Sequence, residues 1–192
     1  SITRHQNSQK YITQTSSVNT TVTPVKSVDK MMRVNTFQYL SYILSDKEEV
    51  LKEKLIKRYS LSIKKAERYA RVIAKVSHTY NIPTDLMAAL IRTESNYFDK
   101  AISHKNAIGP AQIIAKYWKN DCADDLFNIA NNIQCAAIIL NRYKSMCRNN
   151  WDCALKMYNV GPGNYYKKTK FYQQAGVRYL TKIKKNRKHL NS

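Results

Sequence analysis

Glu94 is the residue of this sequence that is best placed for acid–base chemistry. It ends an apolar stripe that lies on one face of a predicted helix and consists of Leu86, Met87, Leu90 and Ile91. A carboxyl group in this position is partly removed from water. Desolvation disfavours its charged form and raises its pKa, which is what a general acid at neutral pH requires.

A structural role is the alternative for Glu94. A carboxylate at a helix end often pairs with a base, and Arg92 and Lys100 are close in sequence. No second acidic residue has an evident claim to act with Glu94. Glu67 lies among basic residues in the first turn of its own predicted helix. The aspartates of the same region fall in turns or at helix starts: Asp85, Asp99, Asp121, Asp124, Asp125 and Asp152.

The elements that must position Glu94 are helices. Apolar residues recur at helical spacing, strand-like alternation is missing, and the chain has only four Gly and four Pro, so we predict an all-α fold. Residues 1–26 are expected to form a disordered or extended tail. Residues 27–60 are expected to be a helical N-terminal extension, and residues 61–192 one globular domain with a basic C-terminal helix.

Within this domain, helices are predicted over residues 62–78, 84–94, 111–118, 128–143, 152–159 and 174–188. Ser62 and Thr84 are the expected N-caps of the first two. The loop after Glu94 contains Gly109, and the chain is expected to break at residues 160–163. The last helix is expected to bury three apolar residues: Val177, Leu180 and Ile183.

The net charge of +20 predicts an acidic partner, such as nucleic acid, anionic lipid or a polyanionic cell-surface polymer. Residues 167–192 contain nine Lys or Arg and no acid. A solvated basic surface explains this excess more simply than nucleic-acid binding, because no recognisable nucleic-acid motif accompanies it. No apolar run is long enough to cross a membrane. Because the chain begins with Ser1, we expect an initiator Met or an export segment to have been removed.

The four cysteines, Cys122, Cys135, Cys147 and Cys153, lie close together but form no CxxC pair, so no metal site is expected. An even, local cluster favours two disulfides. Cys147 and Cys153 could bridge the ends of a short connection, which leaves Cys122 to pair with Cys135. Disulfides indicate an oxidising compartment such as a bacterial periplasm. Buried, reduced thiols in a cytosolic protein are the alternative.

Three blocks of sequence resemble a known family. The first block runs from residues 89–95 (ALIRTES), through residues 101–103 (AIS), to residues 109–113 (GPAQI). The second block is residues 132–136 (NIQCA). The third block is residues 154–164 (ALKMYNVGPGN). In this order and with this spacing, residues 66–183 resemble the catalytic domain of soluble lytic transglycosylases, a goose-type-lysozyme-like family. The resemblance implies a lysozyme-like helical domain with a groove.

The sequence departs from the family pattern at a few positions. Pro110 and Ala111 replace the usual Leu-Met, Asn106 and Ala136 replace Gly, and Ile139 stands where Tyr is frequent. None of these changes removes a group that the chemistry needs. We therefore expect them to affect the shape of the substrate groove and the choice of substrate.

The resemblance implies cleavage of peptidoglycan glycan strands between N-acetylmuramic acid and N-acetylglucosamine, with a 1,6-anhydro product. Glu94 would be the catalytic acid and base, and the substrate's acetamido group would replace a second carboxylate. Substrate-binding roles are implied for four residues: Ser103 at the acetamide, Gln112 along the groove, Tyr158 near Glu94 and Asn159, which either contacts sugar or ties its turn. Ser95 and Gly109 would be structural neighbours of the site. No cofactor is implied.

Other interpretations of the function stay open. A muramidase of the same fold would use water instead, and a non-catalytic component of an envelope machine could retain the fold. The resemblance places the protein in the periplasm or cell envelope, with a phage virion as the alternative. A secretion, conjugation or phage assembly is a candidate partner. The basic tails are expected to concentrate the protein on the wall through its carboxylates.

Overall fold

The computed structural model describes the backbone of residues 26–192 and the side chains of residues 36–192. The expected N-terminal tail, apart from its last residue, lies outside the described residues. The chain divides into two units, residues 1–37 and residues 38–192. In the first unit, the described residues 26–37 are helical and begin α1 (Lys26–Tyr59). The second unit contains the rest of α1 and all the other elements.

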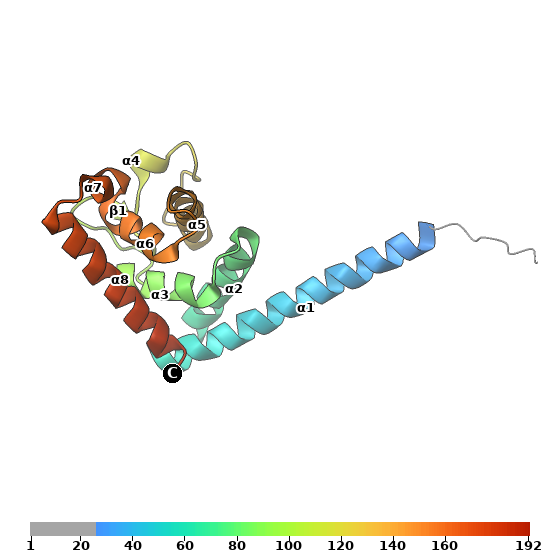
Figure 1. Cartoon of the computed structure of the whole chain (residues 1–192). Coiled ribbons are helices and arrows are strands. Elements are labelled where there is room, and N and C mark those ends of the chain that lie inside the picture. Colours follow the sequence, from blue (N-terminus) through green and yellow to red (C-terminus); the bar gives the residue numbers. More distant parts are fainter. Residues whose placement is uncertain (1–25) are drawn as a thin grey trace, which may run out of the picture. The chain divides into compact units, whose positions relative to one another are not determined.

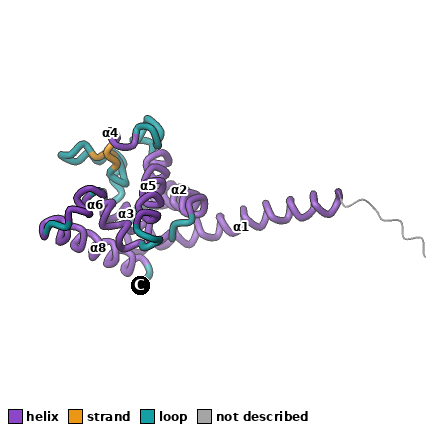
Figure 2. Tube along the Cα trace, turned by 45° about the horizontal axis from the view of Figure 1, so that its top comes forward, coloured by secondary structure: helices purple, strands orange, loops and turns teal. Residues whose placement is uncertain are grey.

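The second unit is built of helices, as the sequence predicted (Figures 1 and 2). After α1 the helices are α2 (Ile63–Tyr80), α3 (Thr84–Ser95), α4 (Ala115–Trp118), α5 (Ile129–Met146), α6 (Trp151–Val160), α7 (Pro162–Lys167) and α8 (Lys170–Leu190). The fold class is that of the lysozyme-like helical domains. The predicted break after α6 occurs at Gly161, and the short helix α7, which was not predicted, begins at the next residue. Helix α8 begins at Lys170, earlier than the expected residue 174.

One small sheet was not predicted. Strands β1 (Ala107–Ile108) and β2 (Ile113–Ile114) pair antiparallel, with Ala107 opposite Ile114 and Ile108 opposite Ile113. The hairpin takes up the loop after α3 and the start of the helix that was expected at residues 111–118. Two-residue strands are too short to produce an alternating pattern, so the sequence carries no signal for them.

Helix α3 is the centre of the core. Every residue from Leu86 to Ile91 is buried, so the apolar stripe that precedes Glu94 is enclosed on all sides. Its N-cap position is held by Pro83 without a side-chain hydrogen bond, and the expected cap Thr84 is the first helical residue. Ser62, by contrast, caps α2 as expected by accepting from the backbone N–H of Lys65.

Helix α8 packs against α3 and α6 (Figure 1). Leu180 and Ile183 are buried as predicted, but Val177 is 51% exposed and Tyr179 is buried at 6%. The expected inward face of this helix was therefore wrong at Val177. The shift matters because it turns a phenol, and not a valine, toward the end of α3.

The last turns of α1 belong to the same core. Leu51, Leu55 and Tyr59 are buried, and the Tyr59 hydroxyl donates to the backbone carbonyl of Asn186 on α8 at 2.8 Å. The predicted helical extension thus ends inside the packed domain. Among the described residues, no helix combines the length and apolar character that a membrane span needs.

Two disulfides fasten the half of the domain that follows α4. Cys122 is bonded to Cys135 and Cys147 to Cys153, which are the two pairs expected from their spacing. The first joins the loop before α5 to the middle of that helix. The second joins the end of α5 to the first turn of α6 and closes a short connection.

Candidate active site

Glu94 lies in the last turn of α3 and is half-buried. The hydroxyl of Tyr179, on α8, donates a hydrogen bond to Glu94 Oε1. Desolvation raises the pKa of Glu94 to about 7, and the Tyr179 hydrogen bond works in the opposite direction by stabilising the carboxylate. The carboxyl can therefore both give up and take back a proton near neutral pH.

Glu94 forms no ion pair in the described part of the chain, so the structural role considered as the alternative is not observed. Arg92 donates instead to the backbone carbonyl of Tyr59 at 3.2 Å, and its guanidinium lies 4.9 Å from the centre of the Tyr59 ring. Lys100 lies over the ring of Phe127 at 5.1 Å. Both bases that are near Glu94 in sequence are thus directed elsewhere, and the side chain that hydrogen-bonds this carboxyl is that of Tyr179.

Tyr179 is the site residue that sequence reasoning missed. It is followed by Leu180 and Ile183, both buried, so it stands at the edge of the apolar face of α8. A phenol on a predicted core face needs a partner for its hydroxyl. That requirement is the signal that could have identified it.

The loop after Glu94 is fixed at both ends. Ser95 donates to the carbonyl of Pro110 at 2.8 Å, which ties the end of α3 to the loop as expected for a structural neighbour. Gly109 has φ +73°, and a Cβ there would lie 2.4 Å from Nδ2 of Asn132. Only glycine suits both this backbone conformation and this close approach.

Asn132 of α5 holds the other side of this loop and is fully buried. Its side chain accepts from the N–H of Ala111 at 2.8 Å and donates to the carbonyls of Ile108 at 2.8 Å and Leu126 at 2.9 Å. The carbonyl of Ala111 accepts from the hydroxyl of Tyr158 at 2.8 Å. The residue before Gln112 is therefore held by α5 and α6 together.

The expected substrate-binding residues separate into two groups. Gln112, Tyr158 and Asn159 all line one cavity of about 590 Å³, together with apolar and aromatic side chains that include Trp118 and Ile139. Ser103 is not part of this lining and neither is Glu94. Tyr158 connects the cavity with Glu94, because burial and the nearby charge of Glu94 both raise the pKa of its phenol.

Some polar atoms of these residues are used within the protein. Ser103 Oγ accepts from the backbone N–H groups of Ala107 at 3.1 Å and Lys105 at 3.3 Å, so it stabilises the turn before β1. Gln112 Nε2 donates to the carbonyl of Gly109 at 2.9 Å. The hydroxyl of Tyr158 is directed to Ala111 and not to Glu94. Asn159 is exposed at the cavity.

The described residues contain no cluster of three or more His, Cys, Asp or Glu that could hold a metal ion. The other acids are mostly engaged in ion pairs away from Glu94: Asp85 with Arg187, Asp99 with Arg68, Asp121 with Arg142 and Asp152 with Lys184. No other carboxylate contributes to the pKa shift of Glu94. The site is thus a single carboxyl group beside a cavity.

The fold and the site together define the class of this protein. It is a helical, lysozyme-like domain with one desolvated carboxyl beside a cavity. The model of the family described as "Transglycosylase SLT domain" matches residues 71–181. The match covers more than half of the chain, and the chain belongs to this family.

One solved structure shows the same fold, and a second is less closely similar. An inactive mutant of the lytic transglycosylase Slt from Pseudomonas aeruginosa is similar with a TM-score of 0.53 and 15% identity, over 71% of this chain and 30% of that one. The 70-kDa soluble lytic transglycosylase of Escherichia coli matches with a TM-score of 0.45 and 16% identity, over 73% of this chain and 28% of that one. This chain therefore corresponds to less than a third of the length of these proteins.

Proposed function

We propose that this protein is a peptidoglycan lytic transglycosylase that uses Glu94 as its only catalytic carboxyl. The observation that carries the proposal is the environment of Glu94: half-buried, bonded to Tyr179, with a pKa of about 7 and without a second carboxylate that influences it. Ordinary glycosidases place two carboxyl groups about 5–9.5 Å apart on either side of the bond. Membership in the Transglycosylase SLT domain family supports the same reaction.

In the proposed reaction, Glu94 first donates its proton to the oxygen that leaves C1 of the N-acetylmuramic acid unit. As this C–O bond breaks, the substrate's acetamido oxygen bonds to C1 and takes up its positive charge. The C6 hydroxyl of the same sugar then attacks C1 and displaces the acetamido oxygen. Its proton passes to the carboxylate of Glu94, which restores the acid and leaves a 1,6-anhydro ring.

The two oxygens of Glu94 divide this work. Oε1 accepts from Tyr179, whereas Oε2 has no hydrogen-bond partner among the described side chains. Oε2 is therefore the atom that we assign to proton transfer. Tyr179 fixes the orientation of the carboxyl and limits the rise of its pKa, so that the carboxylate formed in the first step is stabilised before it acts as a base.

The cavity beside the site supports a sugar substrate. Its lining alternates aromatic and apolar surface with polar groups from Gln112, Tyr158 and Asn159, which suits the mixed faces of a pyranose ring. Ile139 lines this cavity at a position where the family often has Tyr. We infer that this departure changes which sugar substituents the groove accepts.

The two disulfides support a location in an oxidising compartment, and we place the activity in the periplasm or cell envelope. A phage virion is the other location where such a wall-cleaving domain would work. That the protein works as part of a secretion, conjugation or phage apparatus is a hypothesis that rests on the resemblance. Identification of a partner protein would test it.

The test is digestion of purified peptidoglycan with product analysis by mass. The wild-type protein is expected to release fragments with 1,6-anhydro ends, and Glu94→Gln to reduce their rate of formation by about 10²–10⁴-fold. Glu67→Gln, which neutralises an exposed carboxylate of α2, is the matched control. Reducing ends in place of anhydro ends would identify a water-using muramidase, and no product from a folded wild-type protein would identify a non-catalytic component.

A further inference from the structure

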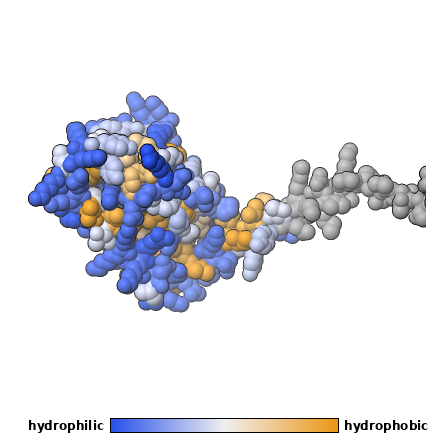
Figure 3. All heavy atoms as spheres, in the orientation of Figure 1, coloured by the Kyte–Doolittle hydropathy of each residue, from blue (hydrophilic) through white to orange (hydrophobic). Residues whose placement is uncertain are grey.

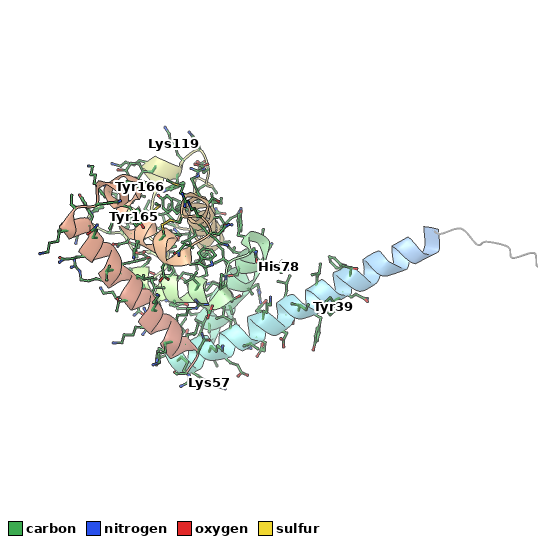
Figure 4. All side chains as sticks on the ribbon, viewed as in Figure 1. Tyr39, Lys57, His78, Lys119, Tyr165 and Tyr166 are labelled. Atoms are coloured by element: carbon green, nitrogen blue, oxygen red, sulfur yellow. A yellow bond between two sulfur atoms is a disulfide. The ribbon has the colours of Figure 1, made fainter. Side chains whose placement is uncertain are left out.

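The corner where α7 meets α8 carries a dense group of aromatic side chains that the proposed site does not use. Tyr166 is 53% exposed and Phe171 67% exposed, while Tyr165 and Tyr172 are half-buried. The rings form two edge-on pairs, Tyr165 with Tyr166 at 5.6 Å and Phe171 with Tyr172 at 5.2 Å. Figure 4 shows Tyr165 and Tyr166 side by side on α7. We call residues 165–177 the α7–α8 corner.

The charge of the corner is entirely positive. No Asp or Glu occurs after Asp152, and Lys167, Lys168 and Lys170 are exposed. Within the described part of the chain, none of these three lysines forms an ion pair. Further along α8, by contrast, Lys184 is paired with Asp152. The face that α8 turns toward the viewer in Figure 3 is accordingly largely hydrophilic.

A hollow lies within this corner. It has a volume of about 310 Å³, and it is lined by Lys156, Tyr165, Lys168, Tyr172, Gln173, Gly176 and Val177. Gly176 lets the side chain of Lys156 pack closely against α8, because a Cβ at this position would lie 3.2 Å from both Cβ and Cγ of Lys156. The hollow thus combines two phenol rings with two ammonium groups and one amide.

Helix α7 contributes to the lining of both the main cavity and the hollow. Pro162 and Asn164 line the main cavity, and Tyr165 of the same short helix lines the hollow. Helix α6 likewise contributes Tyr158 to the first lining and Lys156 to the second. The two cavities are therefore formed by residues that are close in sequence on the same two helices.

We propose that the α7–α8 corner is an accessory binding surface for an anionic glycan, on which the strand continues beyond the main cavity. Sugar rings pack on Tyr165 and Tyr172, because a tyrosine offers a rigid surface that is apolar on its face and polar at its tip. Carboxylates attached to the strand bind Lys156 and Lys168. The inference rests on the proposed function, since that function supplies the glycan.

The lining favours a glycan over a lipid surface. Membrane-surface binding requires a continuous apolar face that enters the lipid, whereas the exposed large side chains of the corner are Phe171, Val177 and the amphipathic Tyr166. The hollow is edged instead by phenol, ammonium and amide groups. Stacking with positive charge also suits single-stranded nucleic acid, so the experiment includes vesicles and an oligonucleotide.

The experiment compares two triple variants of the full chain. Both carry Glu94→Gln, so that the wall is not digested, and each carries two further substitutions. Lys168→Gln with Tyr172→Ala alters the corner. Lys188→Gln with Tyr42→Ala is the matched control, because it removes the same charge and the same ring at exposed positions elsewhere. Circular dichroism establishes that both are folded, and sedimentation with purified peptidoglycan at low ionic strength gives their affinities.

The corner variant is expected to bind the wall about tenfold more weakly than the control. Equal affinities would overturn the inference, because net charge alone would then account for binding. A loss confined to phosphatidylglycerol vesicles or to a single-stranded oligonucleotide would overturn it as well. Binding is measured without turnover, so this result and the product analysis of the proposed function can fail independently.

Discussion

The hydroxyl of Tyr179 donates to the carboxyl of Glu94 although the two residues are 85 positions apart in sequence. The bond joins the end of α3 to the middle of α8 and, against the larger effect of burial, lowers the pKa of the one carboxyl that the proposed reaction uses. Asn186, two turns further along α8, donates to Thr93 at 2.9 Å. The last helix is therefore fixed to α3 at and beside Glu94.

Tyr179→Phe is expected to raise the pKa of Glu94 above about 7, because the hydrogen bond that stabilises the carboxylate is lost while burial stays. The acid form, which starts the proposed reaction, then persists to higher pH. The alkaline limb of the profile of kcat/KM against pH should move upward, while the maximal rate falls because the carboxyl is less well oriented. A lowered rate with an unmoved limb would contradict this account.

Glu94→Gln is expected to stabilise the fold above neutral pH. The folded pKa of about 7 exceeds the ordinary value of 4.5, so the folded state binds more protons than the unfolded state between these values, and the free energy of unfolding falls as pH rises through this interval. At ~1.4 kcal/mol per pKa unit, the loss is at most about 3.5 kcal/mol. Urea unfolding at about pH 8 should show the variant as the more stable protein, with the difference gone near pH 4. A constant difference at both pH values would argue against a raised pKa.

Gly109→Ala is expected to destabilise the protein by about 2 kcal/mol or more. The substitution places a Cβ at φ +73° and 2.4 Å from Asn132 Nδ2, and Asn132 is fully buried and bonded to three backbone groups. Gly163→Ala is the control, since a Cβ there meets nothing within 4 Å. Thermal unfolding of the two variants should show a large loss for the first and little change for the second; similar values would refute the close packing at Gly109.

Reduction of the disulfides is expected to destabilise the loop between α4 and α5. Cys122–Cys135 closes a segment of sequence separation 13, for which a loss of about 3 kcal/mol is typical. The paired replacement of Cys122 and Cys135 by Ser should lower the melting temperature, and a reducing agent should then add only the effect of the second bridge. If the paired variant melts like the oxidised wild type, the bridge does not restrain the unfolded chain.

The predictable parts of this structure are those with a local cause. Leu86 to Ile91 recur at helical spacing, so the helix and its inward face could be read directly and Glu94 located at its end. The short connection between Cys147 and Cys153 likewise indicated a bridge. Gly109 could be singled out as the one glycine in the loop after Glu94, although its contact with Asn132 could not.

The parts that could not be predicted depend on distant contacts. Val177 and Tyr179 are two positions apart on one helix, and which of them faces inward is decided by the docking of α8 on α3. The hydrogen bond from Tyr158 to Ala111 depends in the same way on how α6 meets the loop. Each choice is made by packing between elements far apart in sequence, for which a single sequence carries no periodic signal.

A deletion of the basic C-terminal residues would therefore not be a clean test of whether their positive charge draws the protein to the cell wall. Leu180 and Ile183 are core residues, and Arg187 is paired with Asp85 of α3. Removing the residues after Lys170 would take away α8 as a whole. Point substitutions at exposed lysines, such as those proposed for the α7–α8 corner, separate charge from folding.

The partner of Glu94 lies on α8, 85 positions after it in the chain. A growing chain can already contain α3 with its carboxyl, but without Tyr179 that carboxyl has no phenol to orient it. During synthesis, the pair that we propose for proton transfer is therefore complete only after α8 has been made and has packed on α3.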